Sequence, residues 1–293
     1  MPDFPIIDTH LHLWDPKRLR YTWLDGNPLL NKPYLVEDYK RDSGKVDVEA
    51  MVFLECFCDF TPTGGQYIAE IKFVEDEAKR DPRLKGIVPM APLEWGKRVI
   101  PMLETMARKH PTVKGIRRIV EFAPDPVALT LSPEFIEGVN ALEAFGYHFE
   151  INVNYTQMDM VLEFVRRIPN VPMILDHCGK PGVKGGHIER YRRQTKELAK
   201  HSNVMCKLSD LPVEADWQNW TEVQLRPFID ATLEAFGPDR IIYAGDWPVC
   251  IQATTLERWV GTLDHAFDDM GLPAADQRKI YRDNANRFYR LGL

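Results

Sequence analysis

Three short polar segments of the sequence each follow an apolar run and carry residue types that bind metals or transfer protons. The first holds His10 and His12, the second His177 and the third Asp246. Residues two apart on an extended strand point to the same side, so His10 and His12 can present both imidazoles together. Two histidines with a later carboxylate suit one divalent metal ion, with water as a further ligand.

Asp246 is the strongest single candidate for catalysis. It ends an apolar run between Gly245 and Trp247, so partial desolvation is expected to poise its carboxylate as a general base. The alternative role is a helix N-cap. Pro248 argues against that role, because it separates Asp246 from the helical pattern that begins near Leu256.

His177 precedes a Gly-Lys-Pro-Gly turn, which is typical of a loop that opens onto a site. A histidine in this position can ligate a metal ion or donate a hydrogen bond to a substrate carbonyl, and the sequence leaves both roles open. A structural loop histidine is the alternative.

Further polar residues are candidates for binding a substrate. Arg117 and Arg118 follow an apolar run and could clamp a carboxylate or a hydroxyl-rich ligand, and strand alternation sends one of them inward. Lys207 lies within an apolar run, where a lysine is costly unless it is paired or lines a polar cavity. Trp14 is a candidate for an apolar lid over a ligand. Weaker candidates at strand ends are Glu55, Asn152 and Asn154.

Short apolar runs alternate with longer amphipathic stretches about eight times, which predicts βα units and a parallel sheet. The runs show little polar alternation, as expected for strands buried on both faces. The predicted strands are 4–8, 50–56, 86–90, 113–116, 147–153, 172–175, 204–208 and 240–244. The predicted helices are 67–80, 99–109, 134–145, 158–168, 188–201, 225–236, 256–270 and 274–289.

This pattern predicts a single-domain (β/α)₈ TIM barrel over residues 1–293, with the active site at the carboxyl ends of the strands. A doubly wound open sheet is the main competitor, but no glycine-rich phosphate loop follows the first strand. No linker rich in Gly, Ser or Pro divides the chain. Nucleophile-elbow, P-loop and CxxC motifs are also missing, which excludes the serine hydrolase, P-loop and zinc-finger interpretations.

The composition points to a small-molecule substrate. A net charge of -6, from 37 Lys and Arg against 43 Asp and Glu, offers no footprint for nucleic acid or an anionic membrane. We expect neither partner, and the oligomeric state, monomer or homo-oligomer, stays open. The five cysteines are odd in number and lie mostly in apolar runs, and no signal-like or membrane-spanning stretch is found, so we expect the cytoplasm.

Together these segments resemble the amidohydrolase superfamily, in particular its branch of TIM-barrel lactonases. The resemblance rests on four motifs and spans almost the whole chain. The motifs are Ile7-Asp8-Thr9-His10-Leu11-His12, Leu175-Asp176-His177-Cys178-Gly179, Cys206-Lys207-Leu208-Ser209 and Gly245-Asp246-Trp247-Pro248.

The resemblance implies that His10, His12, His177 and Asp246 form the catalytic cluster, with Arg117 or Arg118 binding substrate. It implies one divalent metal ion, zinc before others, and leaves a metal-independent mechanism open. The chain departs from the branch in having Asp210, where relatives commonly have glycine after Leu-Ser. This added carboxylate favours a neutral, hydroxyl-rich lactone over a dianionic substrate.

The resulting hypothesis is hydrolysis of a sugar lactone or a related small lactone. Asp246 takes a proton from water, the lactone carbonyl is attacked, and His177 helps to stabilise the oxyanion. The alternatives are a metal-dependent decarboxylase of the aminocarboxymuconate type, a pyrone or muconolactone type of lactonase, and a non-catalytic binding protein on a degenerate barrel.

Overall fold

The protein is described by a computed structural model that covers residues 1–59 and 65–293. All strand pairs in it are parallel, and the strands form a three-stranded sheet, β1-β2-β3, and a five-stranded sheet, β4-β5-β6-β7-β8. The strands are β1 (Ile6–Leu11), β2 (Val48–Leu54), β3 (Leu84–Val88), β4 (Gly115–Arg117), β5 (His148–Ile151), β6 (Met173–Leu175), β7 (Val204–Leu208) and β8 (Ile241–Tyr243).

Isolated parallel bridges connect the two sheets at both seams. Ile87 pairs with Val113 between β3 and the approach to β4, and Leu11 of β1 pairs with Trp247 after β8. The backbone N–H of His12 also donates to the Trp247 carbonyl at 2.7 Å. The carboxyl ends of β1 and β8 therefore meet, although they are far apart in the sequence.

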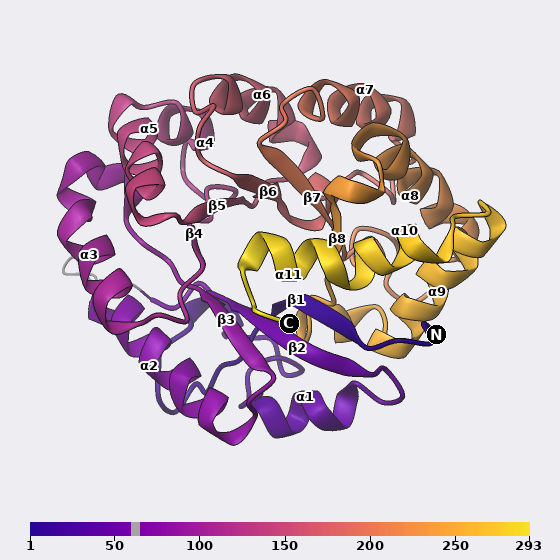
Figure 1. Ribbon diagram of the computed structural model, residues 1–293, viewed down its shortest axis with the longest axis horizontal. Coiled ribbons are helices and arrows are strands. Elements are labelled where there is room, and N and C mark those ends of the chain that lie inside the picture. Colours follow the sequence, from indigo (N-terminus) through magenta and orange to yellow (C-terminus); the bar gives the residue numbers. More distant parts are fainter. Residues whose placement is uncertain (60–64) are drawn as a thin grey trace.

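Helices surround the strands on the outside (Figure 1). Those that follow strands β2 to β8 include the long helices that the hydrophobic periodicity predicted. The α-helices are α1 (Val36–Asp42), α2 (Gly65–Arg80), α3 (Ile100–Lys109), α4 (Pro126–Thr130), α5 (Pro133–Asn140), α6 (Met158–Arg166), α7 (Ile188–Leu198), α8 (Glu222–Phe236), α9 (Leu256–Asp269), α10 (Ala274–Arg278) and α11 (Asn284–Tyr289).

Local capping fixes where several helices begin and end. The Ser132 hydroxyl accepts a hydrogen bond from the Phe135 N–H at 3.2 Å, and Pro133 occupies the first turn of α5. Gly146 ends the helical segment after α5 with a φ of 63°, a left-handed conformation that glycine adopts without strain.

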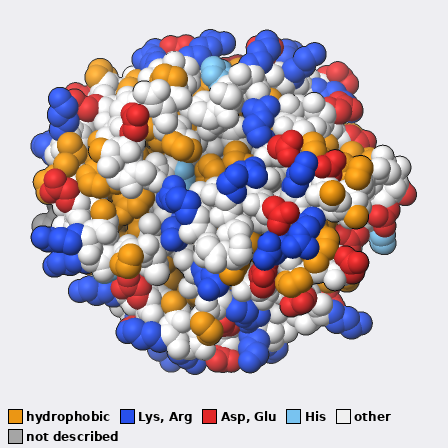
Figure 2. Space-filling view, in the orientation of Figure 1, with side chains coloured by type: hydrophobic (Ala, Val, Ile, Leu, Met, Phe, Trp, Pro, Cys, Tyr) orange, Lys and Arg blue, Asp and Glu red, His pale blue; other side chains and the backbone are white. Residues whose placement is uncertain are grey.

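The space between the strands contains a small apolar cluster that α11 closes at one end. Ile7, Val52 and Ile242 belong to this cluster, together with Tyr289 of α11. The Tyr289 hydroxyl donates to Glu150 Oε1 at 2.8 Å, and its ring packs on His148, the first residue of β5. Helix α11 thus covers the amino ends of the strands (Figure 1). Basic and acidic side chains are interspersed over the face that it covers (Figure 2).

The structure corrects several predicted boundaries. Strand β1 begins two residues later than predicted and extends to Leu11, so His10 lies inside the strand. The predicted helix 274–289 is broken by a π-helical turn over Lys279–Asp283, and the predicted helix 134–145 continues after α5 only as a 3-10 turn. Helices α1 and α4 were not predicted, because each is at most seven residues long. Among the described residues, no helix has the length and apolarity needed to cross a membrane.

Candidate active site

A cavity of about 470 Å³ lies at the carboxyl ends of the strands. Most of the predicted catalytic residues line it, and they come from the ends of β1, β6 and β8 with further polar residues from β4, β5 and β7. The polar residues that line it are His12, Arg117, Asn152, His177, Lys180, Asp210, Glu214 and Asp246.

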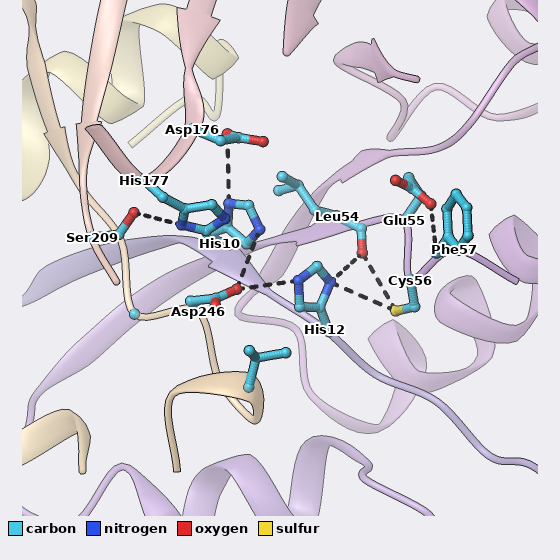
Figure 3. A network of polar contacts seen from close by, with 12 residues as sticks. His10, His12, Leu54, Glu55, Cys56, Phe57, Asp176, His177, Ser209 and Asp246 are labelled. Atoms are coloured by element: carbon cyan, nitrogen blue, oxygen red, sulfur yellow. Dashed lines mark hydrogen bonds and ion pairs between the residues drawn. The ribbon is translucent and has the colours of Figure 1, made fainter. Parts of the chain in front are cut away.

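His10 of β1 and His12, which directly follows β1, converge on Asp246, as Figure 3 shows. His12 Nε2 lies 3.2 Å from Asp246 Oδ1, and His10 Nε2 lies 3.4 Å from the same oxygen. His10 is fully buried beneath the cavity, whereas His12 lines it. The prediction that both imidazoles point to one side is confirmed, and the two rings lie 4.9 Å apart.

His177 completes this cluster from the end of β6. Its ring lies 4.3 Å from that of His10, and its Nδ1 atom lies 3.0 Å from the Ser209 hydroxyl. The backbone at His177 is left-handed, with a φ of 53°, which turns its side chain into the cavity rather than along the strand. Burial lowers the pKa of His177 well below its ordinary value.

Asp246 is held in place by Asp8. The Asp8 carboxylate accepts hydrogen bonds from the backbone of Gly245 at 2.8 Å, from that of His10 at 3.2 Å and from the Tyr39 hydroxyl at 2.9 Å. A Cβ atom at Gly245 would lie 2.5 Å from Asp8 Oδ2, so this contact requires glycine. Asp8 therefore ties the end of β1 to the loop that presents Asp246.

Asp246 is ionised in this setting. Burial raises the pKa of its carboxyl group, but the neighbouring His177 and His12 outweigh burial and hold that pKa below its ordinary value. The side chain is only 2% exposed. A buried, ionised carboxylate at the floor of a cavity can accept a proton from a bound water.

The residues present fit a divalent metal ion. His12 Nδ1 lies 2.9 Å from the Leu54 carbonyl, which only accepts, so Nδ1 carries a proton and Nε2 is the nitrogen left to bind a metal ion. Nε2 faces the Asp246 carboxylate, so a nitrogen and an oxygen ligand converge there. His10, His177 and Asp246 also bring ligand atoms within 4.8 Å of one another.

Arg117 and Arg118 point to different sides of the strand, as strand alternation predicted. Arg117 lines the cavity and is buried, with Nε 2.9 Å from Glu55 Oε1 and Nη1 3.2 Å from Asp176 Oδ2. Its Nη1 atom also lies 3.1 Å from His10 Nε2. Arg118 is not among the described residues that line the cavity, because it forms an ion pair with Glu94 at 2.9 Å.

Lys207 lies below the cavity and not on its wall. It is fully buried, and its ammonium group forms an ion pair with Glu150, lies 3.0 Å from Asp176 Oδ1 and lies 3.2 Å from His10 Nδ1. The prediction that Lys207 contacts substrate is therefore wrong, because its side chain does not line the cavity. Lys207 instead neutralises two buried carboxylates and borders the inner side of His10.

Glu55 and Trp14 also lie behind the cavity wall. Glu55 is fully buried and binds Arg117, so it orients the guanidinium rather than a ligand. Trp14 is fully buried as well, and its indole N–H donates to the Lys32 carbonyl at 2.9 Å. The tryptophan that lines the cavity is Trp23, whose ring packs edge-on against Trp14 at 5.3 Å.

Sequence reasoning assigned no role to Asp176 or Glu150, which carry the buried charge network. A signal for Glu150 was present, because His148, Glu150 and Asn152 alternate along an apolar segment and so share one side of β5. Asp176 directly follows the predicted strand 172–175 and precedes His177, and this position is the signal that could have identified it.

Comparison with known proteins places these residues in a family context. The profile of one family, described as Amidohydrolase, matches residues 7–291. A crystal structure of an amidohydrolase from Burkholderia multivorans with bound zinc superposes with a TM-score of 0.86 at 26% identity, covering 98% of this chain and 100% of that one.

Two curated relatives carry names of activities. An L-fucono-1,5-lactonase of Burkholderia multivorans is 28% identical, over 97% of this chain and 96% of its own. An L-rhamnono-gamma-lactonase of Scheffersomyces stipitis is 27% identical, over 99% of this chain and 100% of its own.

Proposed function

Because the chain belongs to the amidohydrolase family, we propose that it is a hydrolase that opens a small lactone, such as a sugar lactone, to the corresponding hydroxy acid. The observation that carries the proposal is the convergence of His12, His177 and the ionised Asp246 on the floor of one cavity. Relatives named as lactonases, matched over nearly their full lengths, support the same reaction class.

The chain's own residues supply the proton transfers. Asp246 accepts a proton from water as the water oxygen attacks the lactone carbonyl carbon. The bond from that carbon to the ring oxygen then breaks, and Asp246 returns the proton to the departing ring oxygen. The product is one hydroxy acid, which ionises and releases acid at neutral pH.

Arg117 and the cavity histidines stabilise the negative charge that develops on the carbonyl oxygen. The guanidinium has five N–H groups, and four of them have partners among the described residues, in Glu55, Asp176 and His10. The remaining N–H is available to a ligand. A donor fixed in this way before substrate arrives needs no reorganisation during the reaction.

We also propose one divalent metal ion, zinc before others, held by His10, His12, His177 and Asp246. When bound, such an ion supplies Lewis acidity toward the carbonyl oxygen of the substrate. The bound zinc of the Burkholderia relative supports this assignment. A metal-independent mechanism is the alternative, and the two differ at His10 Nε2, which either binds the ion or accepts a hydrogen bond from Arg117.

We propose that the two sheets form one closed (β/α)₈ barrel and that residues 1–293 make one domain. The bridges at both seams and the likeness to the Burkholderia amidohydrolase over 98% of the chain support this. We further propose a cytoplasmic location, which the five unpaired, buried cysteines support. Neither nucleic acid nor a membrane is expected as a partner, and a homo-oligomer stays a prediction to be tested by light scattering.

The test is a panel of lactones offered to the purified protein, with acid release followed by a pH indicator. We expect release from at least one lactone, and loss of that release in Asp246→Asn. If no lactone is opened while aromatic acids lose carbon dioxide, the decarboxylase alternative replaces this proposal. If neither reaction occurs with the metal-loaded protein, the cavity serves binding alone.

A further inference from the structure

The cavity above the catalytic cluster is lined by two unlike sets of side chains. One set is apolar and consists of Trp23, Phe57, Ile119, Phe122, Val213 and Val249. The rings of Phe57 and Phe122 pack edge-on at 6.3 Å, and the Trp23 indole N–H already donates to the Cys56 carbonyl at 2.7 Å. This apolar set therefore offers ring faces and methyl groups to a ligand, and its indole N–H is already paired.

The polar set includes Asn152, whose Oδ1 atom has no partner among the described residues. Asn152 is only 4% exposed, it lines the cavity, and its Oδ1 atom has no hydrogen-bond partner among the described residues. Alternation along β5 explains where it points: Glu150 reaches Lys207 inside the ring of strands, and Asn152 follows on the same side, nearer the carboxyl ends. A buried amide oxygen without a partner is costly, so its position indicates a ligand that donates to it.

Asp210 repeats this observation on the neighbouring part of the wall. It follows β7 with a left-handed φ of 62°, it is 5% exposed, and its carboxyl group shares a hydrogen bond with Asp246, while its Oδ1 atom has no partner among the described residues. Lys180, which also lines the cavity, already donates to Glu121 at 2.6 Å. Asn152 and Asp210 thus both line the cavity, each with a buried oxygen that has no partner among the described residues, and the Lys180 ammonium group is engaged elsewhere.

We infer that the substrate is an amphiphilic lactone, whose hydroxyl groups donate to Asn152 and Asp210 while an alkyl or aryl substituent packs against Phe57, Ile119 and Phe122. This inference rests on the proposed lactonase function and narrows its substrate class. A lactone with a hydroxyl group on every carbon would place some hydroxyl groups against phenyl rings, where they find no hydrogen-bond partner. A lactone without hydroxyl groups would leave the Oδ1 atoms of Asn152 and Asp210 without a donor.

The first experiment compares three five-membered lactones with the purified full chain. They are a pentyl-substituted lactone with a ring hydroxyl, the same lactone without the hydroxyl, and L-rhamnono-gamma-lactone. We expect kcat/KM to be highest for the first, by about tenfold or more over each of the others, as for one lost or misplaced hydrogen bond. Equal or faster opening of L-rhamnono-gamma-lactone would overturn the inference and leave the lactonase proposal intact. Opening of none of the three, nor of any lactone in the panel, would overturn the lactonase proposal itself.

The second experiment tests one residue from the polar set and one from the apolar set. In Asn152→Leu, which keeps the side-chain volume but cannot accept a hydrogen bond, the ratio of kcat/KM between the hydroxylated and the deoxygenated pentyl lactone should fall about tenfold, mainly through KM. In Phe122→Ser, the ratio between the hydroxylated pentyl lactone and L-rhamnono-gamma-lactone should fall instead.

Val223→Ser is the matched control, because Val223 is 82% exposed on α8 and does not line the cavity. It should leave both ratios unchanged. If kcat/KM of Asn152→Leu falls equally for all three lactones, Asn152 has a structural role and the inference is contradicted. Circular dichroism of each variant checks that the fold is retained.

Discussion

His12 binds the Leu54 carbonyl through Nδ1 and faces Asp246 through Nε2, at 2.9 Å and 3.2 Å. The bond to Leu54 fixes which nitrogen carries the proton, since a carbonyl cannot donate. A backbone carbonyl at the end of β2 therefore determines which nitrogen of His12, the residue after β1, faces Asp246. Several tests follow from this and from other buried contacts.

Replacing Asp246 by asparagine removes the proposed base but keeps the shape of the side chain. We expect kcat for lactone opening to fall by at least ~10²-fold, the lower range for a positioned acid-base group. Steady-state kinetics on the best lactone of the panel measures this fall, with circular dichroism as the check on folding. Full activity in this variant would remove Asp246 from the mechanism.

Metal removal separates the two mechanisms that share this site. With a resident zinc ion, dialysis against a chelator should lower activity and the melting temperature together, because a ligand that binds only the folded protein stabilises it. Added zinc should restore both. Metal analysis gives the stoichiometry, expected to be one. Undiminished activity in metal-free protein would show that the histidines act as hydrogen-bonding groups alone.

Lys207→Met tests the buried charge network. Removal of the ammonium group leaves Glu150 and Asp176 without their shared cation in a dry interior. We expect a loss of about 3–5 kcal/mol in the free energy of unfolding, measured by urea denaturation. Lys200→Met is the control, because Lys200 is 63% exposed and pairs with Glu197 at the surface. That control should change stability by less than about 1 kcal/mol.

Glu70 predicts a pH dependence of stability. Burial raises the pKa of this carboxyl group to about 8, and its Oε2 atom has no partner among the described residues. Between its ordinary pKa and about 8, the folded state keeps a proton that the unfolded state has lost. The contribution of Glu70 to stability is therefore present at low pH and declines as pH rises through this window.

Glu70→Gln keeps the shape of the side chain and removes its titration. The variant should flatten the fall in unfolding free energy between about pH 4.5 and pH 8, the range that its ordinary and shifted pKa values define. Urea denaturation of both proteins across this range is the measurement. Parallel curves for the two proteins would refute the assignment to Glu70.

Alternation along single strands predicted much of the site correctly. It placed His10 and His12 on one side, and it required one of Arg117 and Arg118 to face inward. It could not decide between the two arginines, because the choice depends on partners from other strands. Glu55 follows β2 and binds Arg117, whereas Glu94 follows β3 and binds Arg118.

The errors at Lys207 and Trp14 have the same origin. A lysine in an apolar strand faces either a cavity or buried carboxylates, and only the three-dimensional structure shows Glu150 and Asp176 beside it. Trp14 lies near the site, but one layer deeper than Trp23. The eight-unit pattern predicted which end of the strands carries the site. It could not predict which side chains reach the cavity and which lie beneath it, because that depends on how the strands and loops pack together.

The ion pair of Glu150 and Lys207 also has a consequence for how this protein can change over generations. Both residues are fully buried. Loss of Lys207 alone takes the cation from Glu150, and loss of Glu150 alone leaves Lys207 with Asp176, whereas joint replacement by apolar residues removes both charges and leaves Asp176 paired with Arg117. We therefore expect positions 150 and 207 to covary among descendants of this sequence, with intermediates that carry one change but not the other being rare.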